Sequence, residues 1–173
     1  MKIDFDSSNY EVNPLTMAII TKEDISGNPI TVVMEEEAEY VVDMSPRRMM
    51  EYACKFFGSS LKGRQEGTTG ISGITHKIPI SIDPSSGMYF FPTNSPNHRM
   101  CSWISHSHIH KMKKVNNLRT EVIFKNGKSV VLEVSYGSML NQVQRTAQFR
   151  FLLDKRIKLL QQQQVEMIAE TAP

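Results

Sequence analysis

The strongest constraint on the fold lies at Asn126-Gly127, which separates two runs of β-branched and apolar residues, 121–124 and 130–134. Both residues of this pair accept positive φ angles, so the pair predicts a tight β-hairpin between two strands. Other runs of the same kind are bounded by turn-forming residues and predict further strands. These strands are expected at 15–20, 30–34, 40–42, 78–82, 88–91 and 101–112.

Two helices are expected beside the strands. Ser45-Pro46 combines a good N-cap with a residue suited to the first helical position, and apolar residues then recur with helical spacing as far as Gly58. A long second helix begins near Ser138, and its apolar stripe changes face, which suggests two packing partners, first the core and then another helix or subunit. The fold class predicted is α+β, with a mostly antiparallel β-sheet packed against the internal helix 46–57 and the long C-terminal helix.

Charge is distributed unequally along a chain that is expected to form a single domain, 1–160, followed by a C-terminal tail, 161–173. Residues 1–44 hold 2 basic and 10 acidic residues, a net charge of −8. Residues 45–160 hold 18 basic and 6 acidic residues, a net charge of +12. A basic block of this size is typical of a protein that binds a polyanion such as nucleic acid.

Several classes of protein are disfavoured by what the sequence lacks. No apolar run reaches the roughly 18 residues that a membrane span needs, and the first residues do not form a secretory signal. Cys54 and Cys101 lie far apart without CxxC spacing, so we expect reduced thiols in a cytoplasmic protein. The basic block contains few carboxylates and no GxSxG motif, so we expect neither an enzyme nor a cofactor.

Three histidines alternate along the predicted strand 101–112. On a strand, His106, His108 and His110 would share one face, where imidazole nitrogens could bind a metal such as zinc. The chain has no HExxH or CxxC pattern to complete such a site. A metal-binding sensor is therefore the weaker interpretation, beside a pH-responsive cluster, a structural role and contact with nucleic acid.

Basic residues gather in two further segments. Residues 58–73 contain five glycines together with Lys62 and Arg64, which predicts a flexible basic loop able to approach an anion closely. This loop does not match a nucleotide-binding motif, and its length argues against a helix-turn-helix with helix 46–57. The strand 101–112 leads to lysines that could neutralise phosphates, or simply keep a strand edge soluble.

Five segments resemble the ComK family of bacterial competence transcription factors. They are CKFFGSSLKGRQEGT (54–68), ITHKIPISIDP (74–84), FFPTNSP (90–96), CSWISHSHI (101–109) and TEVIFKNGKSVVLEVSYGSMLNQVQRTA (120–147). The resemblance runs in order from about Tyr10 to Ile157. Its blocks FFGSS-x-x-GR and C-x-WISH-x-H are long and unusual, so chance is a poor explanation.

The resemblance implies a transcriptional activator of competence (DNA uptake) genes, located in the cytoplasm at the nucleoid. It implies binding to double-stranded DNA as a dimer or dimer of dimers, at paired A/T-rich boxes and mainly through the minor groove. RNA polymerase is an implied partner. A diverged, non-activating member that acts through protein–protein contacts is the alternative. Charge and placement, rather than the resemblance, select the candidate DNA-binding residues, which are Lys62, Arg64, Lys111, Lys113 and Lys114, with Arg47, Arg48 and Arg119 as further candidates.

Two features depart from the family pattern. The position of His110 is typically basic in the family, which weakens the metal interpretation of the three histidines. Longer family members carry a tail linked to adaptor-mediated Clp proteolysis, and QQQQVEMIAETAP at 161–173 shows no evident counterpart. The resemblance therefore does not extend Clp adaptor control to this chain.

Overall fold

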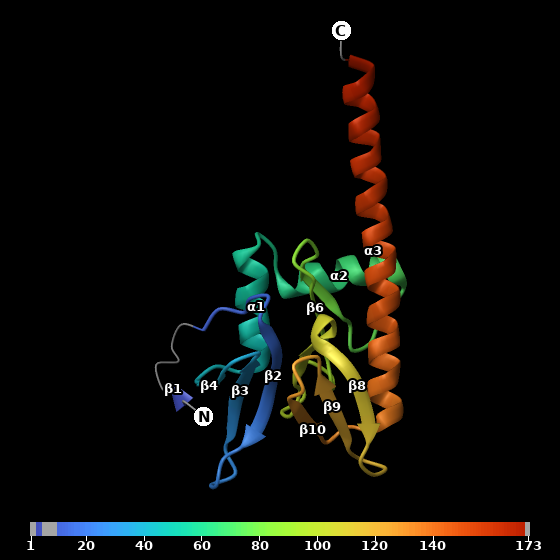
Figure 1. The fold of residues 1–173 in the computed structure, drawn as a ribbon. Coiled ribbons are helices and arrows are strands. Elements are labelled where there is room, and N and C mark those ends of the chain that lie inside the picture. The colour runs from blue at the N-terminus through green and yellow to red at the C-terminus, as the bar shows by residue number, and fades with distance from the viewer. Residues whose placement is uncertain (1–2, 5–9, 172–173) are drawn as a thin grey trace.

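Figure 1 shows the computed structural model of the chain, which describes residues 3–4 and 10–171. Two β-sheets and three helices make up this part of the chain, and all but one of the strand pairs are antiparallel. The α+β prediction is therefore confirmed, although the strands form two sheets rather than one.

The larger sheet has seven strands in the order β1-β4-β3-β2-β7-β6-β5. Only β1 and β4 pair in parallel. The strands predicted at 15–20, 30–34, 40–42, 78–82 and 88–91 all belong to this sheet, with ends that differ by a few residues. Its strands are β1 (Ile3–Asp4), β2 (Thr16–Glu23), β3 (Pro29–Glu35), β4 (Glu39–Val42), β5 (Ile80–Asp83), β6 (Met88–Pro92) and β7 (Trp103–Ser105).

The smaller sheet has three strands in the order β10-β9-β8. They are β8 (Ile109–Lys114), β9 (Thr120–Phe124) and β10 (Ser129–Leu132). The predicted hairpin is confirmed, because β9 and β10 pair across residues 125–128. Only Gly127 of the Asn-Gly pair takes a positive φ, +87°, so the connection is a four-residue loop rather than a two-residue turn.

The seven-stranded sheet is covered on both faces. Helix α1 (Pro46–Phe56) and the start of α2 (Leu61–Ser72) pack on one face, while the smaller sheet and the first turns of α3 (Tyr136–Thr171) pack on the other. Neighbouring residues of one strand therefore enter different cores, since side chains alternate along a strand. Ile19, Val33, Phe90 and Trp103 face the helices, whereas Ile20, Met34, Phe91 and Ile104 face the smaller sheet.

The prediction of a flexible glycine-rich loop at 58–73 is wrong, because most of this segment forms α2. The Ser60 hydroxyl accepts a hydrogen bond from the Gly63 amide at 2.9 Å and caps the helix N-terminus, and Gly73 ends the helix with φ +73°. Thr68 is buried, and its hydroxyl donates to the Pro79 carbonyl at 2.7 Å. These caps and contacts outweigh the low helix propensity of glycine.

Helix α3 has 36 residues and is about 54 Å long at 1.5 Å per residue. Figure 1 shows its C-terminal half, in red, standing clear of the rest of the fold. The residues predicted as a tail therefore continue α3 as far as Thr171. No helix in the described part of the chain is both long enough and apolar enough to cross a membrane.

The predicted change of face along α3 is wrong. Two positions on the buried face of α3 are occupied by polar residues, Gln142 and Thr146. A search for apolar residues alone therefore does not recognise that this face is continuous. Gln142 donates to the carbonyls of Lys77 and Pro92, both at 2.9 Å, and Thr146 donates to the Gln142 carbonyl. One face thus runs through Met139, Gln142, Thr146 and Phe149, all of which are buried.

Candidate nucleic-acid interface

The long strand predicted at 101–112 is interrupted. It divides into β7, a 3₁₀ turn at His106–His108, and β8, and the two strands belong to different sheets. The turn is fixed by Ser107, whose hydroxyl donates to the Gly87 carbonyl at 2.6 Å and accepts from Arg150 at 2.8 Å. The regular alternation of faces is therefore lost in the middle of the histidine segment.

The three histidines consequently lie in different surroundings. His106 is half-buried, and both its burial and the nearby charges of Arg150 and Lys125 lower its pKa. His108 contacts the Pro14 carbonyl at 2.8 Å, and its other ring nitrogen lies 3.7 Å from Glu36, whereas His110 is exposed. Within residues 10–171, no group of three or more His, Cys, Asp or Glu side chains could hold a metal ion.

Strand β8 presents the free lysines of the predicted site. It is an edge strand of the smaller sheet, and Lys111, Lys113 and Lys114 are all exposed on it. None of the three forms an ion pair with another described residue, although Glu121 stands opposite Lys113 in the strand register. Three exposed ammonium groups along one edge can each meet a phosphate without breaking a contact in the fold.

The connection between β8 and β9 carries a further feature that the sequence prediction missed. Residues 115–119 are all exposed, and the Leu118 side chain retains 73% of its full exposure at this tip. The Asn116 side chain accepts from the Leu118 amide at 2.9 Å and so fixes the turn. The sequence carries no signal for this feature, since isolated apolar residues are common both in cores and on surfaces.

The basic residues of α2 are less free than those of β8. Lys62 lies 3.8 Å from Glu66 on the next turn, with both side chains exposed, so this pair is weak. Arg64 is half-buried beside α1, close enough to Cys54 for its charge to influence the pKa of that thiol. The Nε atom of Arg64 is buried without a hydrogen-bond partner. Lys62 is therefore the more accessible of the two cations.

The three further candidates each have a partner within the fold. Arg47 bonds to Glu51 at 3.1 Å and also to Asn97. Arg48 donates to the Tyr52 hydroxyl at 3.4 Å and stacks on its ring, and Arg119 pairs with Glu133 at 2.6 Å. These arginines could still contact phosphate, but each would have to share or exchange an existing interaction.

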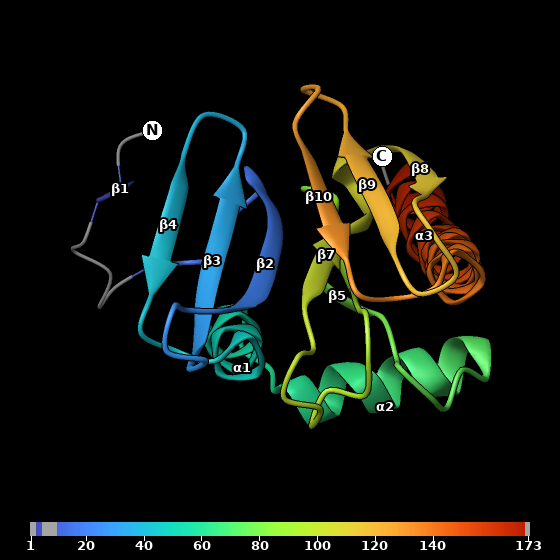
Figure 2. The same cartoon turned by 90° about the horizontal axis from the view of Figure 1, so that it is seen from below.

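The structure does not bring the predicted basic residues into one patch. Helix α2 packs on one face of the seven-stranded sheet, while β8 belongs to the small sheet on the other face. Figure 2 shows α2 and β8 on opposite sides of β5 and β7. The two groups therefore form separate surfaces.

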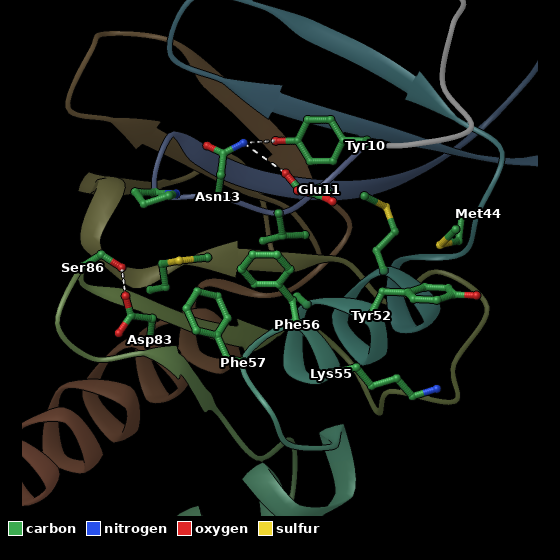
Figure 3. A pocket seen from close by; sticks show the side chains of 15 residues that line it. Tyr10, Glu11, Asn13, Met44, Tyr52, Lys55, Phe56, Phe57, Asp83 and Ser86 are labelled. Carbon is green, nitrogen blue, oxygen red and sulfur yellow. Dashed lines mark hydrogen bonds between the residues drawn. The ribbon is translucent and has the colours of Figure 1, made fainter.

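A groove of about 1070 Å³ lies elsewhere, between the segment 10–14, the end of α1 and the β5–β6 turn. Figure 3 shows the rings of Phe56 and Phe57 lying together in this groove, whereas the Tyr52 ring points away from them. Glu11 and Asp83 also line the groove and would repel phosphates. Its aromatic surface suits an apolar protein partner rather than nucleic acid.

Both cysteines are free thiols and buried. Burial raises the pKa of Cys54 to about 11, and it raises the pKa of Cys101 as well. A thiol with a raised pKa is protonated at neutral pH and reacts poorly as a nucleophile. Cys54 therefore acts as a small packing residue of α1 in the core under the helices.

Comparison with known proteins assigns the chain to a family. The family model described as "ComK protein" matches residues 7–158. A curated relative, the "Competence transcription factor" of Bacillus subtilis (strain 168), is 41% identical over 156 residues, which cover 90% of this chain and 81% of the relative. No solved structure matches. On the extent of these matches, the chain belongs to the ComK family.

Proposed function

We propose that this protein is a DNA-binding transcriptional activator of competence genes, and that its β8–β9 hairpin enters the minor groove of A/T-rich DNA. One observation carries this proposal. Three exposed lysines without ion pairs lead along an edge strand to an exposed tip formed by two asparagines and a leucine. As a DNA-binding protein, the chain would work in the cytoplasm at the nucleoid.

Family membership supports the general part of the proposal. The curated relative is named a transcription factor, and the ComK family is a family of transcription factors. Membership of this family confirms the prediction that the chain is not an enzyme. The finer parts, which are the groove and the contacting residues, depend on the chemistry of the hairpin.

The hairpin has the three parts that minor-groove binding uses. Lys111, Lys113 and Lys114 can neutralise phosphates on the two strands that border the groove. Amide side chains such as that of Asn117 can bond to the acceptors that A·T pairs present at its floor. The exposed Leu118 can act as an apolar wedge between base steps, as in other minor-groove binders.

Helix α2 is the alternative element that could recognise the DNA sequence. Residues 57–60 connect it closely to α1, so the predicted loop no longer argues against a helix-turn-helix. However, the solvent face of α2 carries Gly63, Gly67 and Gly70, which offer no side chains to read base edges in the major groove. We therefore assign Lys62 and Arg64 to a second, weaker contact with the phosphate backbone.

The family implies the arrangement on DNA. Two copies, or a pair of dimers, would occupy paired A/T-rich boxes, each inserting one hairpin, and RNA polymerase would be the partner in activation. The arginines Arg47, Arg48 and Arg119 remain candidates for peripheral phosphate contacts. Clp adaptor control is not part of this proposal.

Replacing base pairs in the DNA tests directly which groove the protein contacts. Inosine·cytosine pairs present nearly the same minor-groove pattern as A·T pairs but a different major-groove pattern, because inosine lacks the amino group of guanine. Gel-shift titrations should therefore give similar affinities for A·T boxes and I·C boxes, and a much lower affinity for G·C boxes. Affinity should also fall steeply with salt.

Two outcomes would contradict the proposal. Loss of binding to I·C boxes would indicate that the protein recognises the sequence in the major groove, and would favour α2 as the recognition element. Self-association without binding to any duplex would favour the alternative of a non-activating member that acts through protein contacts, for which the apolar groove beside Phe56 provides a surface.

A further inference from the structure

The buried face of α3 continues beyond the body of the protein. Its members are separated by three or four residues throughout, which is the spacing of a helix seam. Leu153 and Ile157 are half-buried where the helix leaves the body, and Leu160 is the next member. The seam is defined as Met139, Gln142, Thr146, Phe149, Leu153, Ile157, Leu160, Gln164 and Met167.

The outer part of this seam is exposed and, apart from Gln164, apolar. Leu160 and Met167 retain 65% and 68% of their exposure, and Val165 and Ile168 beside them retain 67% and 70%. Moving apolar side chains of this size out of water is favourable. A helix that keeps the seam spacing of its docked half is therefore shaped to receive a second surface along its outer half.

The charges along the outer half favour one type of partner. Lys155, Arg156 and Lys158 precede the four glutamines at 161–164, whereas Glu166 and Glu170 follow them. A second copy of the same helix, running antiparallel, would place each basic end against an acidic end. A parallel copy would place like charges side by side.

We propose that two copies of this protein associate through the outer halves of α3, paired antiparallel with the glutamines at the centre. In this register Ile157 of one copy packs against Met167 of the other, and Leu160 packs against Gln164. Arg156 and Glu170 are two heptads apart and lie on the same flank of the seam, so each faces the other across the pair. The overlap ends where each helix meets the partner's body.

The inference rests on the proposed dimeric state, but it does not follow from the family comparison. The family model ends at residue 158, so most of the outer seam lies beyond the matched segment. The contact would bury only about four helical turns. Such a small contact predicts a dimer that dissociates on dilution.

A pair of adjacent leucines provides a matched test of the surface. Leu160→Glu places a charge in the seam, whereas Leu159→Glu places it outside the seam on a residue that is also exposed, at 51%. Sedimentation equilibrium of the full chain should show the dimer weakened on the order of a hundredfold or more by Leu160→Glu. Leu159→Glu should change it little.

Charge reversal tests the direction of the helices. Arg156→Glu and Glu170→Arg should each weaken the dimer roughly tenfold, because two attractive pairs per dimer become repulsive. The double variant Arg156→Glu/Glu170→Arg should recover the affinity, since the pairs re-form with exchanged signs. In a parallel dimer these residues lie far apart, so neither the losses nor the recovery would occur.

The results separate this inference from the proposed function. Leu160→Glu should still bind a duplex that contains a single A/T box, because the hairpin is unchanged. A monomeric wild-type chain at all accessible concentrations, equal effects of the two leucine variants, or no recovery in the double reversal would overturn the antiparallel pairing. Loss of DNA binding with an intact dimer would overturn only the proposed function.

Discussion

Strand β8 and helix α2 carry basic residues of the same kind in different settings. The lysines of β8 stand on an exposed edge without ion pairs, whereas Lys62 lies beside Glu66 and Arg64 is half-buried against α1. The sequence offered both segments as equal parts of one surface, but they lie on opposite sides of the central sheet. Local charge thus identifies candidates, and the availability of each charge decides between them.

The largest effect should come from removing the free charges of β8. Replacing Lys111, Lys113 and Lys114 together by alanine should weaken DNA binding roughly 100- to 1000-fold at moderate salt and reduce the salt slope by about 3. Fluorescence anisotropy across a salt series measures both quantities.

A triple alanine variant of Lys22, Lys55 and Lys125, which are exposed outside β8 and α3, removes the same net charge and serves as the control. Equal losses in the two triple variants would mean that overall charge, and not the hairpin, drives binding.

The hairpin tip should give the next largest effect. Leu118→Ala removes the proposed wedge without removing charge, so affinity should fall roughly tenfold and DNA bending should decrease. Circular-permutation gel shifts report the bend. Val131→Ala truncates an exposed residue of β10 in the same sheet and should leave the DNA affinity and the DNA bend unchanged. An unaltered bend in Leu118→Ala would remove the wedge from the mechanism.

The cations of α2 should contribute less. Lys62→Ala should weaken binding only about two- to fivefold, equally for A·T and G·C duplexes, because a backbone contact carries no sequence information. Arg64→Ala should act similarly, with some loss of stability, since this side chain is half-buried. A loss for either variant as large as that of the β8 triple variant would reverse the assignment.

The glycines of α2 should give the smallest effect. A Cβ atom at Gly67 or Gly70 would meet nothing within 4 Å, so each change to alanine should stabilise the fold by about 0.5–1 kcal/mol. Thermal unfolding measures this gain. DNA affinity should remain unchanged, whereas a selective loss of affinity would indicate that DNA approaches α2 closely.

Much of the fold could be predicted from patterns that act locally. The β-branched runs, the cap at Ser45 and the Asn-Gly loop each specify their own element. Helix α2 could not be predicted in this way, because its buried residues, Leu61 and Thr68, gain their role only from distant partners such as Pro79. The division of the strands into two sheets likewise depends on the turn at Ser107, which is held by Gly87 and Arg150.

The candidate site was only partly predictable for the same reason. The lysines of β8 were visible as a charge cluster. The histidines beside them drew attention as a possible ligand set, yet the 3₁₀ turn places them in different surroundings. The exposure of Leu118 could not be predicted, because a single leucine in a sequence gives no sign of whether it is buried or exposed.

The strands with two buried faces also determine how this protein can unfold. Phe90 and Phe91 are neighbours in one strand, but one belongs to the core under the helices and the other to the core under the small sheet. Separation of either layer would therefore expose one apolar face of the same central strands. We expect the body to unfold in one cooperative transition. The β8–β9 hairpin should therefore keep its structure until the seven-stranded sheet unfolds.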